Sequence, residues 1–176
     1  HVHITFSAAA EGGALCGLAG TSVSVWRSEL QKSTASNQGG GIWAAGTMDV
    51  SRSTLVGNQA SNQGGGIYIA NTTSEVDLMW STVVFNKTTS GSGKGGGVYV
   101  VPGGFASVFT STISTNSAFK GAGIANDGTT WINSSTIANN STTGVGQAAG
   151  LYTPGVTNLR NTLLAVNNGR DCSVTP

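Results

Sequence analysis

Residues 37–43 read Asn-Gln-Gly-Gly-Gly-Ile-Trp, and residues 62–68 repeat them almost unchanged as Asn-Gln-Gly-Gly-Gly-Ile-Tyr. Weaker copies stand at residues 12–15, 95–99, 121–124 and 148–152. The first glycines of the copies lie at 39, 64, 95 and 121, which gives spacings of 25, 31 and 26 residues. A small-residue triplet followed by an aliphatic side chain at such a period is the mark of a repeat architecture.

The residues between the copies complete the repeat. They follow the order aliphatic-x-aliphatic, a Ser-Thr pair, an aliphatic and an asparagine, as in residues 48–58. Strands this short cannot bury their apolar faces alone, but coils stacked about 4.8 Å apart can pair each strand with its copies. We therefore expect one all-β domain over residues 1–176, a right-handed parallel β-helix of about six to seven coils with three short strands per coil.

The repeat predicts ladders of equivalent side chains inside the coil. Three apolar ladders are expected: Val25, Val50, Leu78, Val108 and Ile132; Leu30, Leu55, Val83, Ile113 and Ile137; and Leu15, Ile42, Ile67, Val98, Ile124 and Leu151. An asparagine ladder is expected at one corner, where a side-chain amide can bond its neighbour: Asn58, Asn86, Asn116, Asn140 and Asn167. The glycine triplets would mark the opposite corner, where close approach of the coils excludes a Cβ.

The composition excludes two classes of partner. Only 9% of the residues are charged and the net charge is +1, so the chain has no electrostatic footprint for nucleic acid. No apolar run approaches the roughly 18 residues of a membrane span. No set of residues predicts a cofactor or a metal.

The repeats of this chain are similar to those of a known group of proteins. The asparagine and the Gly-Gly-Gly-Ile rhythm, with Phe85-Asn86 in its fullest form, resemble the repeats of polymorphic outer-membrane proteins and related bacterial right-handed β-helix surface proteins. Residues 159–167 with Asp171-Cys172 resemble the last coils of secreted members. The resemblance covers nearly all of the chain and implies a secreted, extracellular or cell-surface location. Such repeats occur in adhesins, passengers and proteins of no known activity.

Three functions are open from the sequence. The first is a non-enzymatic structural subunit that stacks end to end on copies of itself, head to tail, into a filament or surface assembly. The second is an adhesin or passenger fragment that binds glycans or a host surface through an outward aromatic column, for which the candidates are Trp43, Tyr68, Tyr99 and Tyr152. The third is a polysaccharide-active enzyme, for which Asp49 and Asp77 are the best acidic pair, although an ordinary solvated face would also show them.

Head-to-tail stacking has its own candidate residues. Residues 1–6 alternate as a half-buried strand, and Val2, Ile4 and Phe6 could continue the sheet of a neighbouring subunit. Cys16 falls in the first coil and Cys172 in the last, too far apart for a disulfide within one straight subunit but available for one between subunits. The alternatives are a chain cut from a longer β-helix, or free thiols.

Five Asn-x-Ser/Thr sequons allow N-glycosylation in a secreted protein. We expect glycans on Asn71, Asn133 or Asn139 if the source glycosylates asparagine. Asn86 and Asn140 belong to the internal ladder and should stay bare.

Overall fold

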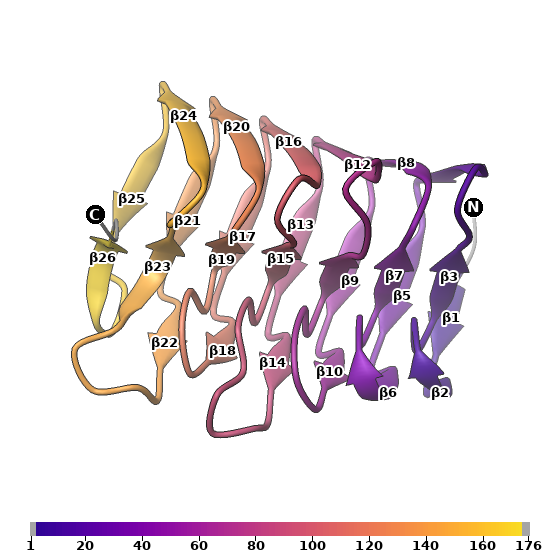
Figure 1. Cartoon of the computed structure of the whole chain (residues 1–176), viewed down its shortest axis with the longest axis horizontal. Helices are drawn as coiled ribbons and strands as arrows, with labels where there is room; N and C mark the ends of the chain where they lie inside the picture. The colour runs from indigo at the N-terminus through magenta and orange to yellow at the C-terminus, as the bar shows by residue number, and fades with distance from the viewer. Residues whose placement is uncertain (1–2, 174–176) are drawn as a thin grey trace.

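The computed structural model describes residues 3–173, and within them the chain is all-β without a helix. Four parallel sheets stack into a β-solenoid of about six turns, consistent with a right-handed parallel β-helix. Figure 1 shows the coils side by side along the long axis, with the two ends of the chain at opposite ends of the molecule.

We call the four sheets A, B, C and D in the order in which each coil visits them. Sheet A contains β1 (His3–Thr5), β5 (Glu29–Gln31), β9 (Thr54–Val56), β13 (Thr82–Val84), β17 (Thr112–Ser114), β21 (Thr136–Ala138) and β25 (Leu163–Ala165). Sheet B contains β2 (Ala8–Glu11), β6 (Thr34–Gln38), β10 (Gln59–Ala60), β14 (Lys87–Thr88), β18 (Ser117–Ala118) and β22 (Ser141–Thr142).

The other two sheets complete the coil. Sheet C contains β3 (Leu15–Gly17), β7 (Ile42–Ala44), β11 (Ile67–Ile69), β15 (Val98–Val100), β19 (Ile124–Asn126), β23 (Ala148–Tyr152) and β26 (Arg170–Ser173). Sheet D contains β4 (Ser22–Trp26), β8 (Thr47–Ser51), β12 (Glu75–Met79), β16 (Phe105–Phe109), β20 (Thr129–Asn133) and β24 (Val156–Arg160).

The expected apolar ladders are confirmed by the strand register. Leu55, Val83 and Ile113 are cross-strand partners in sheet A, and Ile67 lies between Ile42 and Val98 in sheet C. The ladder side chains of the middle coils are almost completely buried. Ile4 and Leu164 extend the sheet A ladder at its two ends. Equivalent residues of successive coils therefore form one continuous core.

The expectation of three strands per coil is corrected, because each full coil contributes four. The additional strands are those of sheet B, which are only two residues long from β10 to β22. A two-residue strand offers a single inward side chain, such as Ala60 or Ala118, so no alternation of apolar and polar residues marks it in the sequence.

The asparagines form a continuous ladder at the corner between sheets A and B. The backbone N–H and the side-chain Nδ2 of Asn58 both donate to Oδ1 of Asn86, at 2.9 and 3.0 Å. The same Nδ2 donates to the carbonyl of Leu30 in the preceding coil. The pattern repeats along the column, and Asn58, Asn86, Asn116 and Asn140 are fully buried. Polar groups that would be costly to bury are thus satisfied by the next asparagine of the ladder and by backbone carbonyls of the preceding coil.

Asp171 ends this ladder on the C-terminal side. The backbone N–H and Nδ2 of Asn167 both donate to Oδ1 of Asp171, at 3.1 and 2.7 Å. The carboxylate takes the place of the next asparagine, so the last rung has the acceptor that its donors need.

A second polar ladder, which sequence reasoning missed, runs between sheets D and A. The N–H of Ser81 donates to Oγ of Ser111, and Oγ of Ser81 donates to the carbonyls of Met79 and Val50. Thr162 takes the serine position in the last coil, where its Oγ1 donates to the carbonyls of Arg160 and Ile132. The serine of each Ser-Thr pair is buried, whereas the threonine is only half-buried on the outer face.

The glycine triplet packs directly against the asparagine ladder. The first glycine, as at Gly64, takes a positive φ of 63°. A Cβ on the third, Gly66, would come within 2.6 Å of the Gly97 carbonyl oxygen and 3.3 Å of the Asn86 side chain. The glycine triplets were expected at the corner opposite the asparagines, and this expectation is corrected. The third glycine of each triplet lies beside the ladder asparagine and makes room for its amide.

Candidate functional surfaces

The aromatic column expected on the surface of sheet C is not an exposed platform. Trp43, Tyr68 and Tyr99 are aligned in register, and the rings of Tyr68 and Tyr99 stack with centroids 5.5 Å apart. However, Tyr68 is only 8% exposed and Tyr99 only 5%. Trp43 and Tyr152 are half-buried at the two ends of this cluster. The expectation of a surface column is therefore corrected to a packed seam.

Charged side chains help to cover the seam. Lys94 Nζ lies 2.6 Å from Oδ2 of Asp127, and the Tyr99 hydroxyl donates to the same oxygen at 2.6 Å. The Lys94 ammonium also lies 5.7 Å from the ring centroids of both Tyr99 and Tyr152, and Lys120 lies over Tyr152. Burial, reinforced by Asp127, raises the pKa of Tyr99 far above its ordinary range, so this phenol stays protonated. These contacts make the aromatic seam and its charged neighbours a structural cluster.

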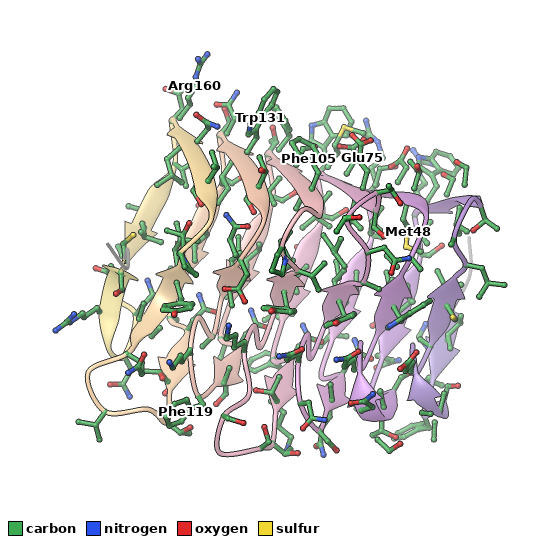
Figure 2. All side chains as sticks on the ribbon, viewed as in Figure 1. Met48, Glu75, Phe105, Phe119, Trp131 and Arg160 are labelled. Atoms are coloured by element: carbon green, nitrogen blue, oxygen red, sulfur yellow. The ribbon has the colours of Figure 1, made fainter. Side chains whose placement is uncertain are left out.

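Three exposed tryptophan side chains lie on sheet D and its edge toward sheet A. Trp26, Trp80 and Trp131 are 51%, 55% and 50% exposed. Figure 2 shows Arg160, Trp131, Phe105 and Glu75 in a row along the upper edge, over β24, β20, β16 and β12. The exposed tryptophans do not stack on one another from coil to coil. Trp131 pairs with Ser107 and Asn158, whereas Trp26 pairs with Ser51. We call the outward residues of sheet D and the adjoining corner the sheet D face.

The three exposed tryptophans of the sheet D face are not equivalent. The guanidinium of Arg27 lies 4.6 Å from the Trp26 ring centroid, and that of Arg52 lies 5.1 Å from the Trp80 ring centroid. No cation lies over the Trp131 ring in the part of the chain that the structure describes. Trp131 instead meets the Phe105 ring in a T-shaped contact with centroids 5.5 Å apart. Half of the Trp131 side chain is thus open to a ligand.

A pocket of about 290 Å³ adjoins Trp131. Its lining comes from three neighbouring strands: Phe109 from β16, Trp131, Ile132 and Asn133 from β20, and Asn158 and Arg160 from β24. The pocket therefore combines aromatic walls with two amides and one guanidinium. Its volume is just below the usual range for ligand pockets, about 300 to 1,000 Å³.

The acidic pair of the sheet D face lies away from this pocket. Asp49 and Asp77 are cross-strand partners in β8 and β12. Ser107 Oγ donates to Oδ1 of Asp77. Two further strands, β16 and β20, separate β12 from β24, so Asp77 is about 14 Å from the level of Arg160 at about 4.8 Å per strand.

The residues expected to form an assembly strand are only partly where the sequence placed them. β1 pairs with β5 of its own chain, and Ile4 lies on the Leu30 ladder. Phe6 leaves the strand with a positive φ of 53° and is 73% exposed, with Lys32 over its ring. It therefore points outward at the corner instead of continuing the strand alternation. Val2 lies outside the described residues.

Both cysteines are free and exposed, in the first and last coils. Cys16 is the cross-strand partner of Trp43, and Cys172 that of Leu151. Burial, with Glu11 adding to it, raises the pKa of the Cys16 thiol; burial and then Asp171 raise that of Cys172. Each thiol is therefore less ionised at neutral pH than a free cysteine.

The sequons differ in exposure. Asn139 is exposed, and Asn71 and Asn133 are half-buried, with Nδ2 of Asn71 donating to the Ala45 carbonyl. Asn86 and Asn140 are fully buried in the ladder. Glycosylation of the first three stays a prediction.

Comparison with protein-family models, curated proteins and solved structures gave no significant match. Within residues 3–173, no helix is long and apolar enough to cross a membrane, and no three histidine, cysteine, aspartate or glutamate side chains lie together as a metal site.

Proposed function

We propose that this protein is an extracellular or cell-surface binding solenoid, whose rigid core presents the sheet D face to carbohydrate chains. The resemblance of its repeats to those of bacterial β-helix surface proteins supports such a location. The role is adhesive and not catalytic. The observation that carries the proposal is Trp131, which is half-exposed, uncovered by a cation and flanked by amides on a rigid sheet.

The chemistry of sugars fits this arrangement. A pyranose ring has faces made of C–H groups that pack on an aromatic ring, and a rim of hydroxyl groups that needs hydrogen-bond partners. Trp131 and Phe109 offer aromatic rings for the C–H faces, and the side-chain amides of Asn133 and Asn158 offer hydrogen-bond partners for the hydroxyl groups. Because strands hold all four residues, little conformational entropy is lost when a ligand binds.

Affinity electrophoresis tests the proposal. The protein is run through native gels that contain soluble neutral or acidic polysaccharides, and retardation reports binding. Trp131→Ala should lose most of the retardation, since truncating an aromatic anchor costs about 2 kcal/mol or more, roughly thirtyfold in affinity. Trp80→Ala is the matched control, because Trp80 is equally exposed but already covered by Arg52, and it should behave as wild type. Equal migration of wild type and Trp131→Ala in every gel would exclude this site.

A second function, end-to-end stacking into a filament, is supported by the apolar first coil. Ile4, Leu15, Val23 and Leu30 line an opening of about 120 Å³ into the core, and the outer edges of β1, β3 and β4 have no neighbour in the described chain. Leu159 and Leu163 are exposed at the last coil. A second copy stacked in register would continue both sheets and ladders.

Stacking ranks second because Asp171 already completes the asparagine ladder at the last coil. Sedimentation velocity over a range of concentrations tests it. Stacking predicts assemblies that Ile4→Glu abolishes, and, if the Cys16–Cys172 disulfide joins neighbours, covalent multimers that a reductant collapses. Monomers at every concentration would remove this function and leave carbohydrate binding untouched.

A further inference from the structure

The pocket beside Trp131 differs from a general sugar platform in one respect, which is the guanidinium of Arg160. Arg160 is exposed at the end of β24 and lines the pocket with Asn158. Neither of the ion pairs within residues 3–173 involves it, since these are His3 with Glu29 and Lys94 with Asp127. A guanidinium is charged at all physiological pH values and prefers planar or tetrahedral oxyanions, which it can bind through two N–H groups.

The carboxylates of the sheet D face lie toward its N-terminal end, away from Arg160. The acidic residues Asp49, Glu75 and Asp77 lie on β8 and β12, whereas β20 and β24 carry no carboxylate. An anion beside Arg160 would thus lie two to three strand spacings, about 10 to 14 Å, from the nearest sheet D carboxylate level. At physiological ionic strength that separation exceeds the screening length of about 8 Å.

From this juxtaposition we propose that the pocket formed by Phe109, Trp131, Asn133, Asn158 and Arg160 is a subsite for an anionic sugar residue, one that bears a carboxylate or a sulfate group. The inference rests on the proposed carbohydrate binding and specifies its ligand. The sugar ring packs on Trp131, its hydroxyl groups face Asn133 and Asn158, and its acid group accepts N–H bonds from Arg160. The size of the pocket suits a single ring and not a longer stretch of chain.

One modification would interfere with this site. Asn133 is part of the pocket lining and also a sequon, so an N-glycan on Asn133 would occupy the subsite. Protein for the test is therefore produced in a host that does not glycosylate asparagine, and its intact mass is checked.

The experiment compares three sugars that share one ring and differ in charge: galactose, galacturonate and galactose 6-sulfate. Each is titrated into isotopically labelled protein, and a dissociation constant is taken from the backbone amide shifts of Trp131 and Asn158. We expect at least one of the two anionic sugars to bind about tenfold more tightly than galactose, and the advantage to shrink as salt is added. Comparison of the carboxylate with the sulfate identifies the acid group.

Arg160→Gln should remove the anionic advantage, so that the variant binds all three sugars with similar affinity. Arg52→Gln is the matched control, since it removes the same charge elsewhere on the sheet D face and should leave the preference intact. Equal affinity for all three sugars, or an anionic preference that survives Arg160→Gln, would overturn the anionic subsite but not carbohydrate binding. If no sugar shifts Trp131 in the wild-type protein, both proposals fail.

Discussion

The corner between sheets A and B and the sheet D face follow opposite rules. At the corner each coil from Asn58 to Asn167 places an asparagine in the same position, and the amides bond the next coil as Asn58 bonds Asn86. On the sheet D face the stacked positions differ freely, as in the column Asp77, Ser107, Trp131 and Asn158. The corner residue is fixed by its two neighbouring copies, whereas an outward sheet D residue is constrained mainly by solvent. The repeated positions therefore hold the fold together, and only the positions that differ from coil to coil can give the surface binding specificity.

The largest expected effect comes from breaking the repeated corner. Asn86→Ala removes the acceptor for two buried donors of Asn58 and the donor to the Leu55 carbonyl. Each unsatisfied buried group costs about 1–3 kcal/mol, so we expect a loss of about 3–5 kcal/mol and a melting temperature lower by about 10 °C or more.

Circular dichroism during heating measures that loss. Lys87→Ala, at the exposed neighbouring residue, is the control and should change stability by less than about 0.5 kcal/mol. An Asn86→Ala protein as stable as its control would show that the ladder does not hold the coils together.

A smaller effect is expected at the glycine triplet. A methyl group at Gly66 would overlap the Gly97 carbonyl oxygen and press on Asn86, so Gly66→Ala should destabilise the protein by about 1–3 kcal/mol. A Cβ at Gly91 would meet no heavy atom within 4 Å, and Gly91→Ala should be neutral or slightly stabilising. Urea unfolding of the two variants separates steric crowding from the general effect of replacing glycine; equal stabilities would refute the crowding.

The repeated positions also show which features of the fold the sequence could predict. The apolar and asparagine ladders were predictable because both obey the period set by the glycine triplets, and a period can be read without coordinates. The serine ladder was hidden, since Ser53 and Thr54 look equally polar although only the serine is buried. Sheet B was hidden by strands of two residues.

The candidate site was less predictable than the fold, and again for a physical reason. The column of Trp43, Tyr68 and Tyr99 has a clear period, but side chains whose type the repeat does not fix, Lys94 and Asp127 among them, reach across and cover it. Conversely, Trp131 lies in a different register column from Trp26, and Arg160 lies in the column of Trp26 and not in that of Trp131. Only the stacking of β20 on β24 brings Trp131 and Arg160 into one pocket, so no local motif announces it.

The smallest expected effect concerns the outer column of sheet C at Cys16. Its raised pKa leaves less thiolate at neutral pH, and the thiolate is the reactive form. Alkylation by iodoacetamide should therefore be slower at pH 7 than for a cysteine in an unstructured peptide, and the midpoint of its pH–rate profile should lie above that of the peptide. A Cys172→Ser protein isolates Cys16 for this profile, and a midpoint at or below that of the peptide would contradict the assigned environment.

The central claim is that ligands bind the unrepeated sheet D face and not the packed aromatic seam of sheet C. The chain has four tryptophans, Trp26, Trp43, Trp80 and Trp131, so fluorotryptophan labelling gives one ¹⁹F resonance for each, assigned by single replacement. Titration with trigalacturonate should shift the Trp131 resonance and leave that of Trp43 unchanged. A shift of Trp43 with Trp131 unmoved would place the site on sheet C, and four unmoved resonances would mean that the sheet D face does not bind this ligand.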